Sequence, residues 1–319
     1  MKIKIDGFVL AIAAAIGAAY LFPQLHWVLP LATIGKTGVF FIFFFYGLKL
    51  SPEKLKAGLK NWKLHLLVQV STFLVFPVLV LLFYPLLQTE QQTNLWVAFL
   101  FLAALPSTVS SSVVMVALAK GNVPAAIFNA SISGLLGVVI TPLWMTAFIP
   151  ATTHTPDLSS IYLNLIVQIL LPVTMGILLQ RFMGHIALRY SKQLSVFDRS
   201  IILLIIFRSF AESFEGNVFK SVSLTDLLVI AGAVTGLFLL VYAITGYVAE
   251  ILKFSDEDRI TLQFCGTKKS LVHGTVFSKI LFENSAAIGI ILLPIMVFHA
   301  VQILIVSILA SRLAHGKQP

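Results

Sequence analysis

The chain has 319 residues, of which 58% are hydrophobic and only 11% are charged, with a formal net charge of +9. A soluble domain has roughly 45–50% apolar and about 25% charged residues, so this composition excludes an ordinary soluble protein. The basic residues form short clusters at the ends of apolar runs, which argues against a nucleic-acid partner and for a lipid bilayer. The single cysteine, Cys265, excludes a disulfide within the chain and a cysteine-based zinc site, and no cofactor is expected.

The apolar runs predict an all-α polytopic membrane protein with ten transmembrane helices, because most of them approach the ~20 residues that a helix needs to cross a bilayer. Proline, glycine and charge clusters mark the ends of the spans. The N-terminal run resembles a signal peptide, but it lacks an A-x-A-like cleavage site, so we interpret it as a retained first helix. In chain order, the predicted spans are residues 7–22, 33–50, 64–84, 95–120, 124–148, 161–180, 196–210, 224–252, 263–279 and 286–313.

Three local patterns inside these spans carry structural expectations. Pro77 should kink the third span, because a proline removes one helical hydrogen bond. Arg208 and Glu212 stand one turn apart near the end of the seventh span, where they can neutralise each other. Gly232 and Gly236 form a G-x-x-x-G face that suits close packing against another helix.

The distribution of lysine and arginine predicts the topology. With the N-terminus inside, the basic residues at 49–63, 120, 181–199 and 253–259 and the C-terminal tail all lie on one side, as the positive-inside rule requires. We therefore expect a multi-pass protein of the plasma membrane, of the bacterial inner-membrane type, with both termini in the cytoplasm.

The ten spans divide into two repeats of five, at residues 1–150 and 151–319. Because five is an odd number, the second repeat must enter the membrane from the opposite face, so the two repeats are inverted. In transporters with this architecture, the binding site lies near the midplane, and rocking of one unit against the other gives alternating access.

The fourth and ninth spans are interrupted by polar residues. The fourth contains ALPSTVSSSVVMVALAKGN at 104–122, and the ninth contains QFCGTKKSLVHGTVFSK at 263–279. Paired interruptions at corresponding places in two halves mark the binding site of secondary transporters. We therefore expect residues 106–112 to lie outside regular helix, and the two broken helices to cross inside the bilayer.

Lys268 is the strongest functional candidate. A charge at bilayer depth costs roughly 2.5–3.5 kcal/mol, so it persists only where it faces protein or a water-filled cavity. No acidic residue inside the spans is an obvious partner, so Lys268 is expected to bind an organic carboxylate or sulfate, to replace a coupling cation, or to release a proton during transport. Residues that supply hydroxyls or a flexible point complete this part of the predicted site: Gly266, Thr267, Ser270, Ser110, Ser111 and Ser112.

The same residues are also compatible with other functions. A cation or proton exchanger would move Na⁺ or H⁺ itself. An intramembrane hydrolase would use Ser110 or Ser111 as the nucleophile and Lys268 as the base. A regulatory membrane protein without transport is the remaining alternative, although the sequence offers no interaction domain.

Three stretches resemble the bile acid:sodium symporter superfamily, in particular its branch of YfeH-type symporters. They read FFFYGLKLSPEKLKAGLKNWKLH, ALPSTVSSSVVMVALAKGN and QFCGTKKSLVHGTVFSKILF, and the resemblance covers almost the whole chain. It implies a panel domain made of spans 1, 2, 6 and 7 and a core domain made of spans 3–5 and 8–10, with spans 4 and 9 broken and crossing.

The resemblance also implies where sodium ligands should lie. The family's motif on the ninth span is E-x-G-x-Q-N, and anchoring it on Gly266 places Phe264 at the glutamate, Lys268 at the glutamine and Lys269 at the asparagine. These departures argue against sodium coupling. They imply that a cation fixed at Lys268 takes the place of a bound ion.

Other family positions transfer only in part. The glutamine of the third span falls on Thr72. The Ser-Asn pair of the fourth falls on Ser111 and Ser112, or on Ser112 and Val113 when it is counted back from Gly121. Two hydroxyl ligands of the fifth span are replaced by alanine, with Asn129 and Ser133 close by. A residual sodium site would therefore consist of Ser111, Ser112 and Asn129. Together these observations predict a secondary active transporter of a small organic anion, with Na⁺ or H⁺ as the only coupling ions to consider, and not an enzyme.

Overall fold

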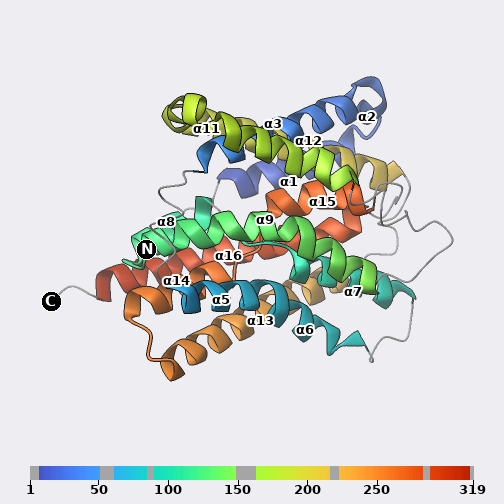
Figure 1. The fold of residues 1–319 in the computed structure, drawn as a ribbon. Helices are drawn as coiled ribbons and strands as arrows, with labels where there is room; N and C mark the ends of the chain where they lie inside the picture. Colours follow the sequence, from blue (N-terminus) through green and yellow to red (C-terminus); the bar gives the residue numbers. More distant parts are fainter. Residues whose placement is uncertain are drawn as a thin grey trace. The chain divides into compact units, whose positions relative to one another are not determined.

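The computed structural model describes residues 7–50, 61–84, 90–108, 110–148, 163–215, 223–282 and 288–316. All regular secondary structure in these ranges is helical, which confirms the predicted all-α class (Figure 1). Six helices are long and apolar enough to cross a membrane, as expected of a polytopic membrane protein. They are Leu31–Lys49, Trp62–Leu81, Val123–Phe148, Leu163–Arg189, Leu224–Ile251 and Ile288–Ala314.

The other four predicted spans are shorter, more charged or divided. Helix α1, Gly7–Leu21, has only 15 residues. Helix α12, Ser191–Glu215, is long enough but carries acidic and basic side chains along its length. The fourth and ninth spans are each split into two shorter helices. Ten crossings in two inverted repeats, 1–150 and 151–319, therefore stay a prediction.

The chain divides into two compact units, each built from segments that are distant in sequence. The first unit comprises residues 1–51, 150–223 and 275–292. The second unit comprises residues 52–149, 224–274 and 293–319.

In the first unit, α3 lies along both α11 and α12, and α1 lies along α12 (Figure 1). Helices α11 and α12 both extend beyond the predicted ends at residues 180 and 210, and the short α2 was not predicted. The elements of this unit are α1, α2 (Leu25–Val28), α3 (Leu31–Lys49), the π-helical stretch η3 (Ile166–Leu170), α11 (Leu171–Arg189) and α12.

The backbones of α3 and α11 approach each other closely at two glycines. A Cβ atom on Gly47 would overlap the carbonyl oxygen of Val173, and one on Gly176 would overlap the carbonyl oxygen of Phe44. Small residues of this kind let two helix backbones come together in a membrane protein.

In the second unit, α14 packs against α5, α8, α9 and α13. Helices α15 and α16 each contribute residues to both units. The elements are α5 (Trp62–Val70), the π-helical stretch η1 (Ser71–Val75), α6 (Phe76–Leu81), α7 (Glu90–Ala104), α8 (Ser110–Leu118), α9 (Val123–Phe148), α13 (Leu224–Ile251), α14 (Asp256–Gly266), α15 (Leu271–Leu281) and α16 (Ile288–Gly316).

The disturbance expected at Pro77 takes the form of the π-helical stretch η1. Phe76 donates its N–H to the carbonyl of Ser71, five residues earlier. In this register the carbonyl of Thr72 faces position 77, where proline has no N–H to donate. The carbonyl of Thr72 is therefore available to a donor from elsewhere in the chain.

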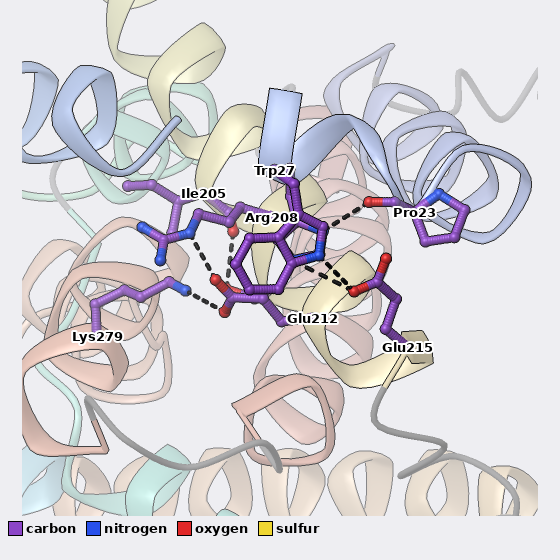
Figure 2. A network of polar contacts seen from close by, with 9 residues as sticks. Pro23, Trp27, Ile205, Arg208, Glu212, Glu215 and Lys279 are labelled. Atoms are coloured by element: carbon purple, nitrogen blue, oxygen red, sulfur yellow. Dashed lines mark hydrogen bonds and ion pairs between the residues drawn. The ribbon is translucent and has the colours of Figure 1, made fainter. Parts of the chain in front are cut away.

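The other two local patterns have opposite outcomes. The ion pair between Arg208 and Glu212 is confirmed, with Nε of the arginine 2.6 Å from Oε1 of the glutamate (Figure 2). The close packing expected at Gly232 and Gly236 is not found among the described residues, because a Cβ built on either one has no neighbour within 4 Å outside the adjoining residues and backbone of its own helix.

Replacing Gly176 by alanine should destabilise the protein by about 1–3 kcal/mol, since the added methyl group overpacks the contact between α3 and α11. Gly232→Ala is the matched control. It meets no neighbour, and alanine favours a helix by about 1 kcal/mol over glycine. Thermal unfolding of the purified variants, followed by tryptophan fluorescence, measures both effects. Equal unfolding temperatures would contradict the close approach of the two helices.

Candidate functional site

The two interrupted spans contain the predicted helix breaks. Helix α7 ends at Ala104 and α8 begins at Ser110, while α14 ends at Gly266 and α15 begins at Leu271. The first break is shorter than predicted, because Ser110, Ser111 and Ser112 form the first turn of α8. The serines that follow Pro106 are thus divided between an extended segment and a helix start.

The two broken segments bind each other through backbone groups. Ser270 donates its N–H to the carbonyl of Pro106 at 2.8 Å, and the hydroxyl of Ser107 donates to the carbonyl of Cys265 at 2.6 Å. The N–H of Ser107 reaches the hydroxyl of Ser133 at 2.9 Å. Lipid cannot satisfy the groups that a helix break exposes, so these bonds allow both breaks to exist inside a membrane protein.

Lys269 is the most fully coordinated side chain at the breaks. Its ammonium donates to three backbone carbonyls, those of Thr72 at 2.6 Å, Ala103 at 2.6 Å and Leu105 at 2.9 Å. It also lies 4.3 Å from the centre of the Phe76 ring, which adds a cation–π contact. An ammonium has three N–H donors, so these three bonds use all of them.

The local fold explains why these three carbonyls are available. Ala103 and Leu105 lie at the C-terminal end of α7, where the last carbonyls of a helix have no intrahelical partner and carry partial negative charge. The carbonyl of Thr72 is freed by the π-helical stretch before Pro77. The backbone of Lys269 is held in place by Gln302 of α16, which accepts from its N–H at 2.8 Å and donates to its carbonyl at 2.9 Å.

Lys268 is equally buried but has far fewer partners. Both lysines are 0% exposed. The ammonium of Lys268 donates to one acceptor, the carbonyl of Ser111, at 2.8 Å. Within the described part of the chain, neither lysine forms an ion pair with a carboxylate. Two of the three donors of Lys268 therefore have no acceptor among the described residues.

Hydroxyl groups of the first break lie beside the carbonyl that Lys268 contacts. Thr108 shares hydrogen bonds with the hydroxyls of Ser111 and Ser112, each at 2.8 Å. The hydroxyl of Ser111 is thus engaged by a threonine, whereas Lys268 contacts its carbonyl. A hydrolase with Ser111 as the nucleophile would need the lysine to approach the serine hydroxyl, so this arrangement gives that form of the alternative no support. The side chain of Ser110 lies outside the described residues.

The predicted site residues of the second break form hydrogen bonds with neighbouring residues of the same unit. The carbonyl of Gly266 accepts from Ser71 at 2.9 Å, and the hydroxyl of Thr267 bonds one turn back to the carbonyl of Gln263 at 2.5 Å. The hydroxyl of Ser270 pairs with Nδ1 of His273 at 2.9 Å.

Asn129 lies in a different polar cluster. Its side-chain amide contacts Nδ1 of His65 at 2.9 Å and the carbonyl of Ala125 at 3.0 Å, and its Oδ1 accepts from Gln69 at 3.2 Å. No hydrogen bond among the described residues joins Asn129 to Ser111 or Ser112. The sodium site suggested for these three residues remains a prediction with no shared contact to support it.

Sequence reasoning missed the contact of Lys269 with three carbonyls and the part played by Gln302. The signal for Gln302 was present in the sequence, because it is the single side-chain amide in the long apolar helix α16. A buried amide in such a helix needs partners for the same reason as a buried lysine. The carbonyls could not be read from the sequence, because every residue has one.

Comparisons with known proteins identify the family of the chain. The SBF-like CPA transporter family model matches residues 6–315. An uncharacterised protein of Pseudomonas aeruginosa is 36% identical over 98% of this chain and 94% of its own length. The protein named "Putative symporter YfeH" of Escherichia coli K12 is 33% identical over 97% of this chain and 92% of its own. Sodium/bile acid cotransporter 7 of Rattus norvegicus is 30% identical, again over 97% and 92%.

The resemblance inferred from the sequence is thereby confirmed. The family model covers nearly the whole chain, and the relatives match it over most of their own length. The chain is a multi-pass membrane protein that belongs to the SBF-like CPA transporter family.

Proposed function

We propose that the protein is a secondary active transporter that moves a small organic anion by alternating access. Membership of a transporter family supports transport, as do relatives whose names contain symporter and sodium/bile acid cotransporter. Two broken helices that bind each other are the arrangement in which such carriers place their substrate and ion sites. On the evidence of the basic clusters, we assign it to a bacterial-type plasma membrane with both termini in the cytoplasm.

The coordination of Lys269 carries this proposal. Three carbonyl oxygens at 2.6–2.9 Å surround its ammonium. Rings of backbone carbonyls are also how proteins replace the hydration shell of a bound metal cation. We infer that the ammonium occupies the position of a coupling ion, so that transport does not require sodium. Sequence reasoning assigned this role to the neighbouring residue, and the contacts favour Lys269.

Lys268 is then available for the substrate. Two donors of its ammonium have no acceptor among the described residues, and they lie near the hydroxyls of Thr108, Ser111 and Ser112. A carboxylate or sulfate accepts from such donors more strongly than a neutral group does. The two lysines thus have different roles. Lys269 stabilises the helix breaks, and Lys268 binds the anion.

A proton exchanger is the second candidate, and one observation favours it. The single partner of the Lys268 ammonium is the neutral carbonyl of Ser111, which could still accept a hydrogen bond from the neutral amine after Lys268 releases a proton. Flux driven by a pH gradient alone, without any organic anion, would identify this function. Flux that requires the organic anion would identify the carrier.

Removing the ammonium of Lys269 should make the stability of the protein depend on sodium. In Lys269→Ala three buried carbonyls lose their donor, and each unsatisfied group costs about 1–3 kcal/mol. Na⁺ at a hundredfold excess over its Kd should return about 2.7 kcal/mol to the variant. Thermal unfolding in NaCl and in choline chloride measures both effects. Lys63→Ala, at an exposed position, is the control and should behave like the wild type in both salts. Equal stabilisation of the wild type by Na⁺ would contradict the proposal.

Removing the charge of Lys268 should strongly impair transport while leaving the protein folded. Lys268→Gln and Lys268→Ala each lose a charged hydrogen-bond donor to the anion, which should lower uptake by roughly tenfold to a hundredfold. Uptake of radiolabelled carboxylates and sulfonates into proteoliposomes provides the measurement. Unchanged uptake in both variants would remove Lys268 from the mechanism.

A further inference from the structure

The first unit contains a cavity of about 390 Å³ that the predicted site does not include. All of its lining residues belong to that unit, and they come from α3, η3, α12 and α15. The volume falls within the roughly 300–1,000 Å³ of small-molecule sites. Much of the wall is apolar and consists of Leu31, Val39, Leu204, Ile205, Val276 and Ile280.

The charged residues of this cavity are mainly cationic. Lys36, Arg208 and Lys279 reach it, and Glu212 is the only carboxylate in its lining. The lining therefore carries two positive charges that no lining carboxylate balances. A cleft lined mainly by charges of one sign attracts ions of the opposite sign, so the cavity favours an anionic occupant.

Glu212 is shared between two of the cations. Its Oε1 accepts from Nε of Arg208 at 2.6 Å, and its Oε2 lies 3.3 Å from Nζ of Lys279, so that it links α12 to α15 (Figure 2). Both side chains are partly open, with 31% of Arg208 and 24% of Lys279 exposed. The ion pairs are thus accessible to a competing anion.

Two sets of donors remain for such an anion. Arg208 bonds to Glu212 only through Nε, and its Nη atoms donate to no residue in the described ranges. Lys36 forms no ion pair within the same ranges. The fork of a guanidinium matches the two oxygens of a carboxylate or sulfonate, and an ammonium nearby adds a second charge.

We infer that this cavity binds an amphipathic organic anion, with its acid group between Arg208 and Lys36 and its apolar body against the aliphatic wall. Glu212 is an internal competitor that occupies Arg208 and Lys279 when no ligand is bound. The inference rests on the proposed function, because it gives the transported anion a binding site in the first unit, separate from Lys268.

The chain offers matched controls on the same helix. Glu215, three residues beyond Glu212, accepts from the indole N–H of Trp27 at 2.8 Å and does not line the cavity. Figure 2 shows the two carboxylates with separate partners. Lys192 lies near the other end of α12, is exposed and does not line the cavity either.

Isothermal titration calorimetry of naphthalene-1-sulfonate into phosphatidylcholine nanodiscs tests the inference, with empty nanodiscs subtracted. Arg208→Gln should weaken binding roughly tenfold or more, because a charged donor to the sulfonate is lost. Lys36→Gln should weaken it by about threefold, since its side chain is exposed. Glu212→Gln should tighten binding by about threefold, because the competing carboxylate is gone. Glu215→Gln and Lys192→Gln should bind like the wild type.

The opposite effects of Arg208→Gln and Glu212→Gln separate a binding site from a structural ion pair. Loss of a merely structural pair would lower the unfolding temperature of both variants and tighten binding in neither. The neutral naphthalene-1-sulfonamide should show no difference among the variants. If phosphatidylglycerol in the nanodisc abolishes sulfonate binding, the site belongs to a lipid headgroup and the inference is overturned.

The same experiments distinguish this inference from the proposed function. Sulfonate binding that is equal in all cavity variants but lost in Lys268→Gln would overturn the cavity assignment and leave the carrier intact. A wild type that neither binds nor transports an organic anion would overturn both.

Discussion

The structure of the second unit depends on one requirement, which is that carbonyl groups freed by a helix break must find a donor inside the protein. Water is scarce in a bilayer core, and lipid offers no hydrogen bond. The end of α7 and the π-helical stretch before Pro77 leave three such carbonyls, and one ammonium satisfies them all. Lys269 consequently stabilises the backbone at the helix breaks, as do the hydrogen bonds between the two broken segments.

Cations are stabilised in two different ways in the two units. In the second unit, the ammonium groups of Lys268 and Lys269 donate hydrogen bonds only to backbone carbonyls, so the compensation comes from dipoles and carries no opposing charge. In the first unit, Arg208 and Lys279 share one carboxylate, and that compensation is a charge that another anion can replace. Carbonyls fixed in the backbone cannot exchange partners in this way. The need to compensate a positive charge is thus met by fixed carbonyls in the second unit and by a carboxylate that another anion can replace in the first unit.

The sequence predicted much of the fold because its signals were local. Each of these signals is contained in a short, continuous stretch of sequence. They are the apolar runs, the two polar interruptions, and the pair formed by Arg208 and Glu212. The first break was placed too long because a serine run is compatible both with an extended segment and with the first turn of a helix. The ends of α11 and α12 were placed too early because basic and polar residues also extend helices beyond an apolar run.

The site was harder to predict because its contacts are distant in sequence. Lys269 and Thr72 are separated by 197 positions, and their bond depends on a carbonyl released by a change of helix type at Pro77. The sequence identified two adjacent lysines but had no means of assigning a partner to each. Asn129 shows the same limit, since its polarity indicated a ligand whereas its neighbours His65 and Gln69 use its amide.

The attachment of the ammonium of Lys269 to the chain has a thermodynamic consequence. A diffusible ion that is carried across the membrane contributes its electrochemical potential difference to the accumulation of the solute. An ammonium on a side chain returns with the protein in every cycle and contributes no net work. Active accumulation of the anion therefore requires that another species, such as a proton, crosses together with it. Without such coupling, the carrier brings the anion only to its electrochemical equilibrium, which the membrane potential sets.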